Sequence, residues 1–320
     1  MNKMLMRLKS NNILRNMCVE TTFLKDQIIQ PIFISNQVDV KKEIPGIPSN
    51  YVMNLNDSIK QIESDLENQQ RNFLIFMIPS HKSEFDFNLE FQQKVILKIK
   101  ETFKNEIFLW ADVCLCSMTT HGHCCIFDNN KNIDLNKSLS SLSELALSYS
   151  QAGVDGIAPS DMMDGRTSSI RKILDDNSFH LLPIMSYSTK FASNFYGPFR
   201  HAADSSPTFG DRKQYQLDYR NKSEAIRASV RCFEEGADLL MVKPGQGSID
   251  LIETIKNKTG LMVGAYQVSG EYAGIALAAE KNLLNLNDAL LESWHVMKRA
   301  GAQFIISYGA RKSKELGIRE

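Results

Sequence analysis

The amino-acid sequence predicts an α/β protein in which eight strands alternate with helices around a closed barrel. Short apolar segments rich in β-branched and aromatic residues recur along the 320 residues, and helical periodicity fills most of the intervals between them. Strands that are apolar on both faces and separated by helices are typical of a parallel sheet covered on its outer side. Eight such units, with no G-x-G-x-x-G turn after the first strand, favour a (β/α)8 TIM barrel over an open doubly wound sheet.

The elements of this barrel follow one another in a regular order. The eight expected strands cover 28–34, 72–79, 106–115, 154–160, 181–188, 237–244, 261–269 and 303–309. Between them apolar residues recur at three- and four-residue spacing, for example over 138–153, 222–237 and 286–302, and a glycine ends each of these stretches. We therefore expect residues 26–320 to form one barrel domain and residues 1–25 to form an N-terminal arm. An arm outside the core is most economically buried against another subunit, which predicts a homo-oligomer.

The charge balance of the chain excludes some classes of partner. Lysine plus arginine equals aspartate plus glutamate, at 37 each, so no net field draws the protein to nucleic acid or to an anionic membrane. Apolar stretches such as 73–78 are far shorter than the roughly 20 residues that span a bilayer. Hydrophobic residues make up 43% of the chain and are enough for a large core, so the six cysteines are not needed as disulfides. These features predict a cytoplasmic protein with a small-molecule partner.

Polar side chains gather where the expected strands end. In a barrel the carboxyl ends of all strands form one mouth, where the chemistry of such enzymes is found. The polar residues expected there are Asp112, Cys114, Cys116, Ser160, Asp161, Lys190, Lys243, Tyr266, Ser269 and Tyr308. This mouth is therefore the candidate active site.

Two lysines at this mouth indicate covalent chemistry. Lys243 ends an apolar strand in "LLMVKPG", where loss of hydration favours the neutral amine that forms Schiff bases. The alternative is a lysine that extends out of the barrel end into water. Lys190, which we expect just past the neighbouring strand, supports the catalytic interpretation, because two ammonium groups close together disfavour each other's charge.

The stretch "WADVCLCSMTTHGHCC" holds a candidate metal site. Cys114, Cys116 and Cys124 can supply three corners of a tetrahedral zinc site and leave the fourth open for water or substrate. His121 and His123 could replace one thiolate or orient the ligands. The alternative is a set of buried thiols without a metal. The adjacent Cys125 is not expected to reach the same ion.

A long segment with many Gly, Pro and Ser residues follows the strand near Lys190. It covers about 191–216, and loops of that length in compact domains are usually functional lids or disordered. Arg200 and Arg212 within it suit a clamp for a carboxylate that forms when the lid closes. The alternative for either arginine is a solvated loop charge.

These residues resemble the porphobilinogen synthase family, also called δ-aminolevulinic acid dehydratase, over nearly the whole chain. The resemblance is carried by "DVCLCSMTTHGHC" (112–124), "APSDMMDGR" (158–166), "YSTKFASNFYGPFR" (187–200), "GDRKQYQ" (210–216), "MVKPG" (241–245) and "YQVSGEY" (266–272). Enzymes of this family are lyases that condense two molecules of 5-aminolevulinate into porphobilinogen, with release of two waters, in tetrapyrrole (haem) synthesis. The resemblance also implies a homo-oligomer, commonly an octamer.

The resemblance implies a role for each matched residue. Lys243 would hold the first substrate as a Schiff base, with Ser269 and Tyr308 on its carboxylate, and Lys190 would hold the second. The remaining implied roles are carboxylate binding by Arg200, Arg212 and Gln216, catalytic Zn²⁺ binding by Cys114, Cys116 and Cys124, and further active-site contacts by Asp112, Ser160, Asp161, Tyr196 and Tyr266. Of these, Asp112 and Asp161 would handle protons and orient the substrates.

The chain also departs from the family pattern. Ala228 stands where many bacterial members carry a glutamate that helps to bind an allosteric magnesium, so we expect no magnesium site of that type. Cys125 replaces a usual glycine. Two rival functions are considered: an aldolase-type lyase that uses Lys243 alone with a structural zinc, and a non-enzymatic scaffold stabilised by zinc. The second lysine and the lid arginines argue against the scaffold.

Overall fold

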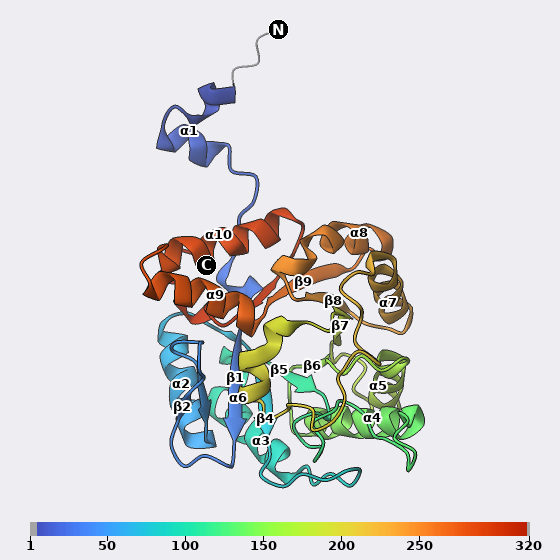
Figure 1. Cartoon of the computed structure of the whole chain (residues 1–320). Coiled ribbons are helices and arrows are strands. Elements are labelled where there is room, and N and C mark those ends of the chain that lie inside the picture. Colours follow the sequence, from blue (N-terminus) through green and yellow to red (C-terminus); the bar gives the residue numbers. More distant parts are fainter. Residues whose placement is uncertain (1–4, 319–320) are drawn as a thin grey trace.

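The computed structural model describes residues 5–318, and its strands form a barrel surrounded by helices (Figure 1). The barrel strands are β1 (Ile28–Ser35), β4 (Asn72–Ile78), β5 (Phe108–Val113), β6 (Gly156–Pro159), β7 (Met185–Lys190), β8 (Leu239–Lys243), β9 (Met262–Gln267) and β10 (Ile305–Ser307). They lie side by side in the order β6-β5-β4-β1-β10-β9-β8-β7, and neighbours in this order pair in parallel. The predicted TIM barrel is confirmed.

The barrel has a seam between β6 and β7, the two strands at the ends of this order. An isolated bridge between Ile157 and Ile184 joins them, and the Ile157 amide donates to the carbonyl oxygen of Pro183 at 3.0 Å. Both contacts lie at or before the start of β7, away from the mouth. The barrel is therefore nearly closed, and its strands are least paired along the seam between β6 and β7, on the side that leads to the mouth.

Helices follow most of the strands and cover the outer face of the barrel (Figure 1). The longer helices are α2 (Leu55–Glu67), α3 (Glu90–Phe103), α4 (Leu135–Gln151), α5 (Arg166–Asp176), α7 (Lys222–Glu234), α8 (Ile249–Thr259), α9 (Ser269–Glu280) and α10 (Leu286–Arg299). Asn54, Asp134 and Asn285 cap three of them by accepting from backbone amides of the first turn. Each such cap stabilises the fold by about 1 kcal/mol.

The core explains why these segments became strands. All eight residues of β1 are buried, and the six residues of β7 are buried as well. Full burial of one Ile or Phe side chain stabilises the fold by about 1.5–3 kcal/mol. Trp294 on α10 is also fully buried, and its indole N–H donates to Gln267 at 3.2 Å, so its one polar atom is satisfied. The helices thus pack their apolar faces on a sheet that is buried on both sides.

The fifth predicted strand begins and ends too early. Strand β7 is Met185–Lys190, whereas Leu181 is 98% exposed. Arg171 on α5 donates to the carbonyl oxygens of Phe179 and Leu182, both at 2.8 Å, so these residues form a loop. Lys190 is consequently the last residue of its strand and does not follow it. The structure also adds a short pair that was not predicted, β2 (Lys42–Glu43) and β3 (Tyr51–Met53), of which β3 pairs with β1.

Phe23 of the expected arm packs against Trp294 in the core, but the chain before it, over residues 5–17, lies apart from the barrel (Figure 1). Its elements are η1 (Leu5–Lys9) and α1 (Asn12–Met17), and the side chains of Ile13 and Met17 are 83% and 74% exposed. Residues 1–4 of the expected arm and residues 319–320 of the expected barrel domain lie outside the described residues. Within residues 5–318, no helix combines the length and apolar character that crossing a bilayer requires.

Candidate active site

The two predicted lysines lie side by side at the mouth of the barrel. Lys190 ends β7, Lys243 ends β8, and the two are paired across the strands in register. Their side chains are buried, at 4% and 3% exposure. Lys243 therefore does not extend into solvent, and the alternative considered for it is excluded.

Aromatic rings surround the amine of Lys243. Its Nζ lies 4.0 Å from the ring centre of Tyr266, 4.8 Å from Phe199, 5.0 Å from Tyr187 and 5.5 Å from Tyr196. We call these four rings the aromatic cage. Burial, and then the nearby charge of Lys190, lower the pKa of Lys243 to about 7. Aromatic faces attract a cation, but here the loss of hydration outweighs that attraction, so a neutral amine is available near neutral pH.

Tyr187 and Phe199 belong to the site although the sequence did not indicate them. Residues three apart on a regular strand point to opposite faces, so Tyr187 and Lys190 should diverge. The β7–β8 pairing, however, shifts register between Ser186 and Thr189, and the Lys190 Nζ lies 5.7 Å from the Tyr187 ring. Such an irregularity re-aims a side chain. The motif spelled "YSTK" carried no sign of it.

Polar groups surround Lys190 instead. Its Nζ donates to the carbonyl oxygen of Ser160, in the segment that follows β6. Asp112 on β5 is half-buried, and loss of hydration raises its pKa to about 7 against the opposing charge of Lys190. Burial likewise raises the pKa of Asp161, against the opposing charge of Arg166. The structure therefore brings together both lysines, both aspartates and Ser160, as predicted from their places at strand ends.

The three predicted metal ligands form a compact cluster. The sulfur atoms of Cys114, Cys116 and Cys124 lie within 4.8 Å of one another, and all three residues are buried. A zinc ion bound at about 2.3 Å to each sulfur would set these atoms roughly 3.8 Å apart. Hydrogen bonds from the other two thiols lower the pKa of Cys116 well below its usual value, so one thiolate is already favoured. The cluster thus fits a metal that prefers sulfur.

Cys125 belongs to the core and not to this cluster. It is fully buried in the same apolar cluster as Leu115, Met118 and Ile126. Burial raises the pKa of its thiol, which keeps the sulfur protonated and inert. The expectation that Cys125 does not share the metal agrees with this placement, and its role is that of a small apolar side chain.

The two histidines form hydrogen bonds to the lid and are not part of the cysteine cluster. His123 Nε2 is 2.9 Å from the carbonyl oxygen of Phe209, and its Nδ1 is 3.0 Å from the hydroxyl of Tyr215. His121 accepts at Nδ1 from the His123 amide and, through its carbonyl oxygen, from the amide of Thr208. Neither imidazole joins the cysteine cluster found among the described residues. Their substitution for a thiolate is therefore not supported.

The expected lid segment lies against residues 114–125, the segment that carries the three cysteines, which we call the metal loop. It contains η4 (Asn194–Tyr196) and α6 (Gly197–Ala202), which were not predicted. Arg212 is buried and donates to the carbonyl oxygens of Gly122 and Ser205. Gly122 has φ +70°, and a Cβ there would lie 2.4 Å from the carbonyl oxygen of Ser206. The lid and the metal loop are therefore in close backbone contact.

Several polar atoms of the lid have no partner within residues 5–318. They are Arg200 Nε, Ser205 Oγ, Arg212 Nε and both amide atoms of Gln216. Burial, and then the nearby charge of Arg212, lower the pKa of Arg200, so the two guanidinium groups are neighbours. Buried donors without a partner are costly, so they suit an anionic ligand such as a carboxylate. Neither arginine is a solvated loop charge.

Ser269, Tyr266 and Tyr308 lie on the Lys243 side. The Ser269 hydroxyl donates to the carbonyl oxygen of Phe195 at 3.2 Å and accepts from the amide of Phe199 at 3.1 Å. The Tyr266 hydroxyl donates to that of Tyr308 at 3.4 Å. All three residues are buried, and Tyr266 contacts Lys243 directly. Tyr308 bonds to Tyr266 and Ser269 bonds to the backbone of Phe199, so each adjoins a member of the aromatic cage.

Known proteins resemble this chain over nearly its full length. Residues 2–316 match the family model for delta-aminolevulinic acid dehydratase. The curated delta-aminolevulinic acid dehydratase of Helicobacter pylori strain J99 is 42% identical to it, over 98% of this chain and 98% of the relative. That of Staphylococcus aureus strain Mu50 is 40% identical, over 95% of this chain and 95% of the relative. The crystal structure of the Toxoplasma gondii enzyme, complexed with the reaction product porphobilinogen, superposes with a TM-score of 0.95 at 33% identity, covering 98% of this chain and 91% of that one.

Proposed function

Because the chain belongs to the delta-aminolevulinic acid dehydratase family, we propose that it is a porphobilinogen synthase. It condenses two molecules of 5-aminolevulinate into porphobilinogen and two waters, as a lyase of tetrapyrrole (haem) synthesis. The observation that carries the proposal is the pair of buried lysines in register at the ends of β7 and β8. Two amines side by side can hold two ketone substrates covalently, and this removes most of the entropic cost of bringing them together.

Lys243 forms the first Schiff base. Its neutral amine attacks the ketone of 5-aminolevulinate, water leaves, and the carbon beside the resulting iminium loses a proton more readily. The aromatic cage keeps water away from this imine, and Ser269 and Tyr308 bind the carboxylate of the substrate. Tyr266 supports Tyr308 through its hydroxyl.

Lys190 forms the second Schiff base, among charged and polar groups. Arg200, Arg212 and Gln216 bind the second carboxylate, which is supported by their unpartnered polar atoms. Asp112 interacts electrostatically with both lysines, which suits proton transfer from one substrate to the other. Asp161 and Ser160 orient the second substrate, and Tyr196 closes the first pocket.

The cysteine cluster binds a catalytic Zn²⁺. Cys114, Cys116 and Cys124 would hold it, and their three sulfurs leave one corner of a tetrahedron for a substrate atom. When bound, the ion supplies a Lewis acid that polarises the ketone or binds the amino group of the second substrate. We place the thiols on the Lys190 side of the mouth, which is supported by the lid residue Arg212 and by Lys190, both of which favour the charged form of Cys116.

No allosteric magnesium site of the glutamate type is expected. Ala228 lies on α7 beside a cavity of about 640 Å³ that is also lined by Glu224, Arg227 and Arg231. Without a carboxylate at residue 228, the cavity has too few oxygen ligands on this helix for a divalent cation. Added Mg²⁺ should therefore leave the zinc-loaded enzyme unchanged.

The arm supports a homo-oligomeric assembly, and we propose an octamer in the cytoplasm. Residues 1–25 would be the arm for subunit contacts, with Ile13 and Met17 covered by a neighbouring subunit. Thiols that serve as metal ligands belong in a reducing compartment. Sedimentation of the full chain and of a variant lacking residues 1–25 tests the role of the arm. Removal of the arm should lower the mass of the assembly.

One experiment tests the proposed function directly. The pure protein is incubated with zinc and 5-aminolevulinate, and pyrrole formation is measured with and without a chelator. Borohydride reduction followed by mass spectrometry then locates the imines, expected on Lys243 and Lys190. An aldolase-type lyase would instead form a single reducible imine on Lys243 and survive chelation, and no pyrrole in the presence of zinc would overturn the proposal.

A further inference from the structure

Arg166 is an unusual residue in this molecule because nothing about its local position favours it. It is the first residue of α5, and its side chain is fully buried. A buried guanidinium loses its hydration, and a cation at a helix N-terminus opposes the helix dipole. Its contacts must therefore offset both costs.

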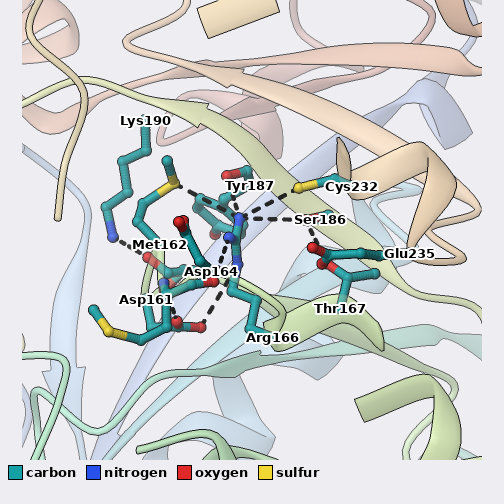
Figure 2. Close-up of polar contacts among 12 residues, drawn as sticks. Asp161, Met162, Asp164, Arg166, Thr167, Ser186, Tyr187, Lys190, Cys232 and Glu235 are labelled. Carbon is teal, nitrogen blue, oxygen red and sulfur yellow. Dashed lines mark hydrogen bonds and ion pairs between the residues drawn. The ribbon is translucent and has the colours of Figure 1, made fainter. Parts of the chain in front are cut away.

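These contacts join three separate elements (Figure 2). Arg166 Nη1 donates to the carbonyl oxygen of Met163 at 3.1 Å, and Nη2 donates to that of Tyr187 on β7 at 2.9 Å. Nη2 also lies 3.4 Å from Ser186 Oγ and 3.8 Å from Cys232 Sγ on α7. One planar group thus holds the loop after β6, the strand β7 and the helix α7.

The bond from Arg166 to Tyr187 crosses the seam of the barrel. Backbone pairing between β6 and β7 is confined to the Ile157–Ile184 bridge, below the start of β7. Tyr187 lies further along β7 toward the mouth, three residues before Lys190. A side chain therefore supplies, near the reacting end of the seam, a connection that the sheet hydrogen bonds supply elsewhere in the barrel.

The same guanidinium faces a catalytic carboxylate. Arg166 Nε lies 3.8 Å from Asp161 Oδ2, and within residues 5–318 neither of these two atoms has a hydrogen-bond partner. The other oxygen, Asp161 Oδ1, accepts from the Met163 amide at 2.6 Å. The carboxylate is therefore fixed at one oxygen and free at the other, with the free oxygen next to the positive charge.

We propose that Arg166 is the positioning residue that sets Lys190 and the Ser160–Asp161 segment at their working separation, by holding both sides of the β6–β7 seam. It does not touch substrate. It acts on the second lysine through the β7 backbone at Tyr187 and on Asp161 through charge, whereas no hydrogen bond or ion pair within residues 5–318 joins it to Lys243, which meets the ring of Tyr187. This inference rests on the proposed function, in which Lys190 binds the second substrate.

Arg171 is a matched control on the same helix. It also donates to two backbone carbonyl oxygens, of Phe179 and Leu182, and pairs with Asp175, but it holds the loop before β7 instead of the mouth. The test compares Arg166→Lys and Arg166→Met with Arg171→Lys and Arg171→Met in the full zinc-loaded chain. For each variant, kcat and KM for 5-aminolevulinate, the thermal midpoint, and the borohydride-trapped adducts on Lys190 and Lys243 are measured.

Arg166→Lys should lower kcat by about 100-fold, the effect of a displacement near 1 Å at a reacting group, with KM changed less than about threefold. The ratio of Lys190 adduct to Lys243 adduct should fall with it, and Arg166→Met should show a larger loss. Both Arg171 variants should keep kcat and the adduct ratio, even where their thermal midpoint falls. A ratio that changes in only one pair of variants separates positioning from general stability.

Other outcomes overturn the inference. They are an Arg166→Lys protein with the kcat and adduct ratio of the wild type, an Arg171 variant with the same loss of kcat, or an Arg166→Lys protein that does not fold, which would assign Arg166 to stability alone. If only Arg166→Met fails to fold, Arg166→Lys decides the question. Wild-type protein that forms no pyrrole would overturn the proposed function and this inference with it, whereas active wild type with a normal Arg166→Lys overturns the inference alone.

Discussion

Lys190 and Lys243 are the same residue type on neighbouring strands, yet their surroundings differ. Lys243 is enclosed by the four rings of the aromatic cage, and Lys190 donates to the carbonyl oxygen of Ser160 and faces Asp112 and the thiols. The strands place the two amines together, and the neighbouring side chains make them different. One half of the mouth is dry and aromatic, while the other is charged and built to hold a metal.

The difference indicates a division of labour. A dry aromatic pocket with a neutral amine suits formation and protection of an imine, whereas a charged pocket suits a substrate that must be polarised and clamped. We therefore expect the Lys243 half to work alone and the Lys190 half to depend on the metal and on the lid. The predictions below test this asymmetry.

The largest effect is expected for Lys243→Met. It removes the first nucleophile, so pyrrole formation should fall by about 10⁴-fold or more. The thermal midpoint at pH 7 should not fall, because an apolar side chain replaces an amine that is buried among rings and has no hydrogen-bond or ion-pair partner within residues 5–318. The exposed Lys172→Ala serves as a control and should keep full activity. Substantial activity of Lys243→Met would contradict the division.

Removal of the metal should affect only the second half. Cys124→Ser, or chelation of the wild type, should lower pyrrole formation by about 100-fold or more, since a Lewis acid contributes several kcal/mol to the transition state. Borohydride trapping on Lys243 should persist, because that lysine lies in the aromatic cage and not at the cysteines. Cys125→Ala gives the matched thiol control, with full zinc content and a lower thermal midpoint. Loss of Lys243 trapping on chelation would show that the halves are not separable.

The pH dependence of the first imine should follow Lys243. Its pKa of about 7 lies below the usual 10.5, so the neutral amine predominates above pH 7 and is lost as the pH falls through that value. The rate of single-turnover trapping on Lys243 should therefore drop roughly tenfold per unit below pH 7. The same shift destabilises the fold as the pH falls from about 10.5 toward 7, because the unfolded chain binds the proton more readily. A trapping rate that stays constant down to pH 5 would count against a neutral Lys243.

The smallest effect is expected for Tyr196→Phe. The ring remains beside Lys243, but the hydroxyl is lost. That hydroxyl donates to the backbone carbonyl oxygen of Phe191 at 2.8 Å and lies 3.2 Å from the backbone carbonyl oxygen of Lys243. Stability should fall by about 1 kcal/mol, and kcat should change less than about tenfold. Urea unfolding and steady-state assays measure the two. A loss as large as that of Lys243→Met would assign the hydroxyl to the chemistry itself.

Most of the barrel and much of the site could be predicted from the sequence, because buried strands are continuous apolar runs and polar residues at their ends are conspicuous. Lys243 in "LLMVKPG" is such a residue. The start of β7 was misplaced because Leu181 and Leu182 are apolar, although Leu181 is exposed. Apolar type alone does not distinguish a strand from the loop that leads into it.

The remaining features depend on contacts that local sequence does not encode. Tyr187 enters the site through a register shift, His123 uses both ring nitrogens on the lid, and Arg166 begins a helix like any surface arginine. Cys125 was expected to stay outside the metal site but had no assigned role, and its place in the core supplies one. In each case the deciding partner lies far away in the chain.

The metal loop and the lid pack so closely at Gly122 that no side chain fits between them. A single methyl group there would meet the carbonyl oxygen of Ser206 at 2.4 Å, on a backbone that already favours glycine. Gly122→Ala should therefore push the lid away from the metal loop while leaving both lysines in place. Such a protein would load its first substrate and stop, which would make the first half-reaction open to direct observation.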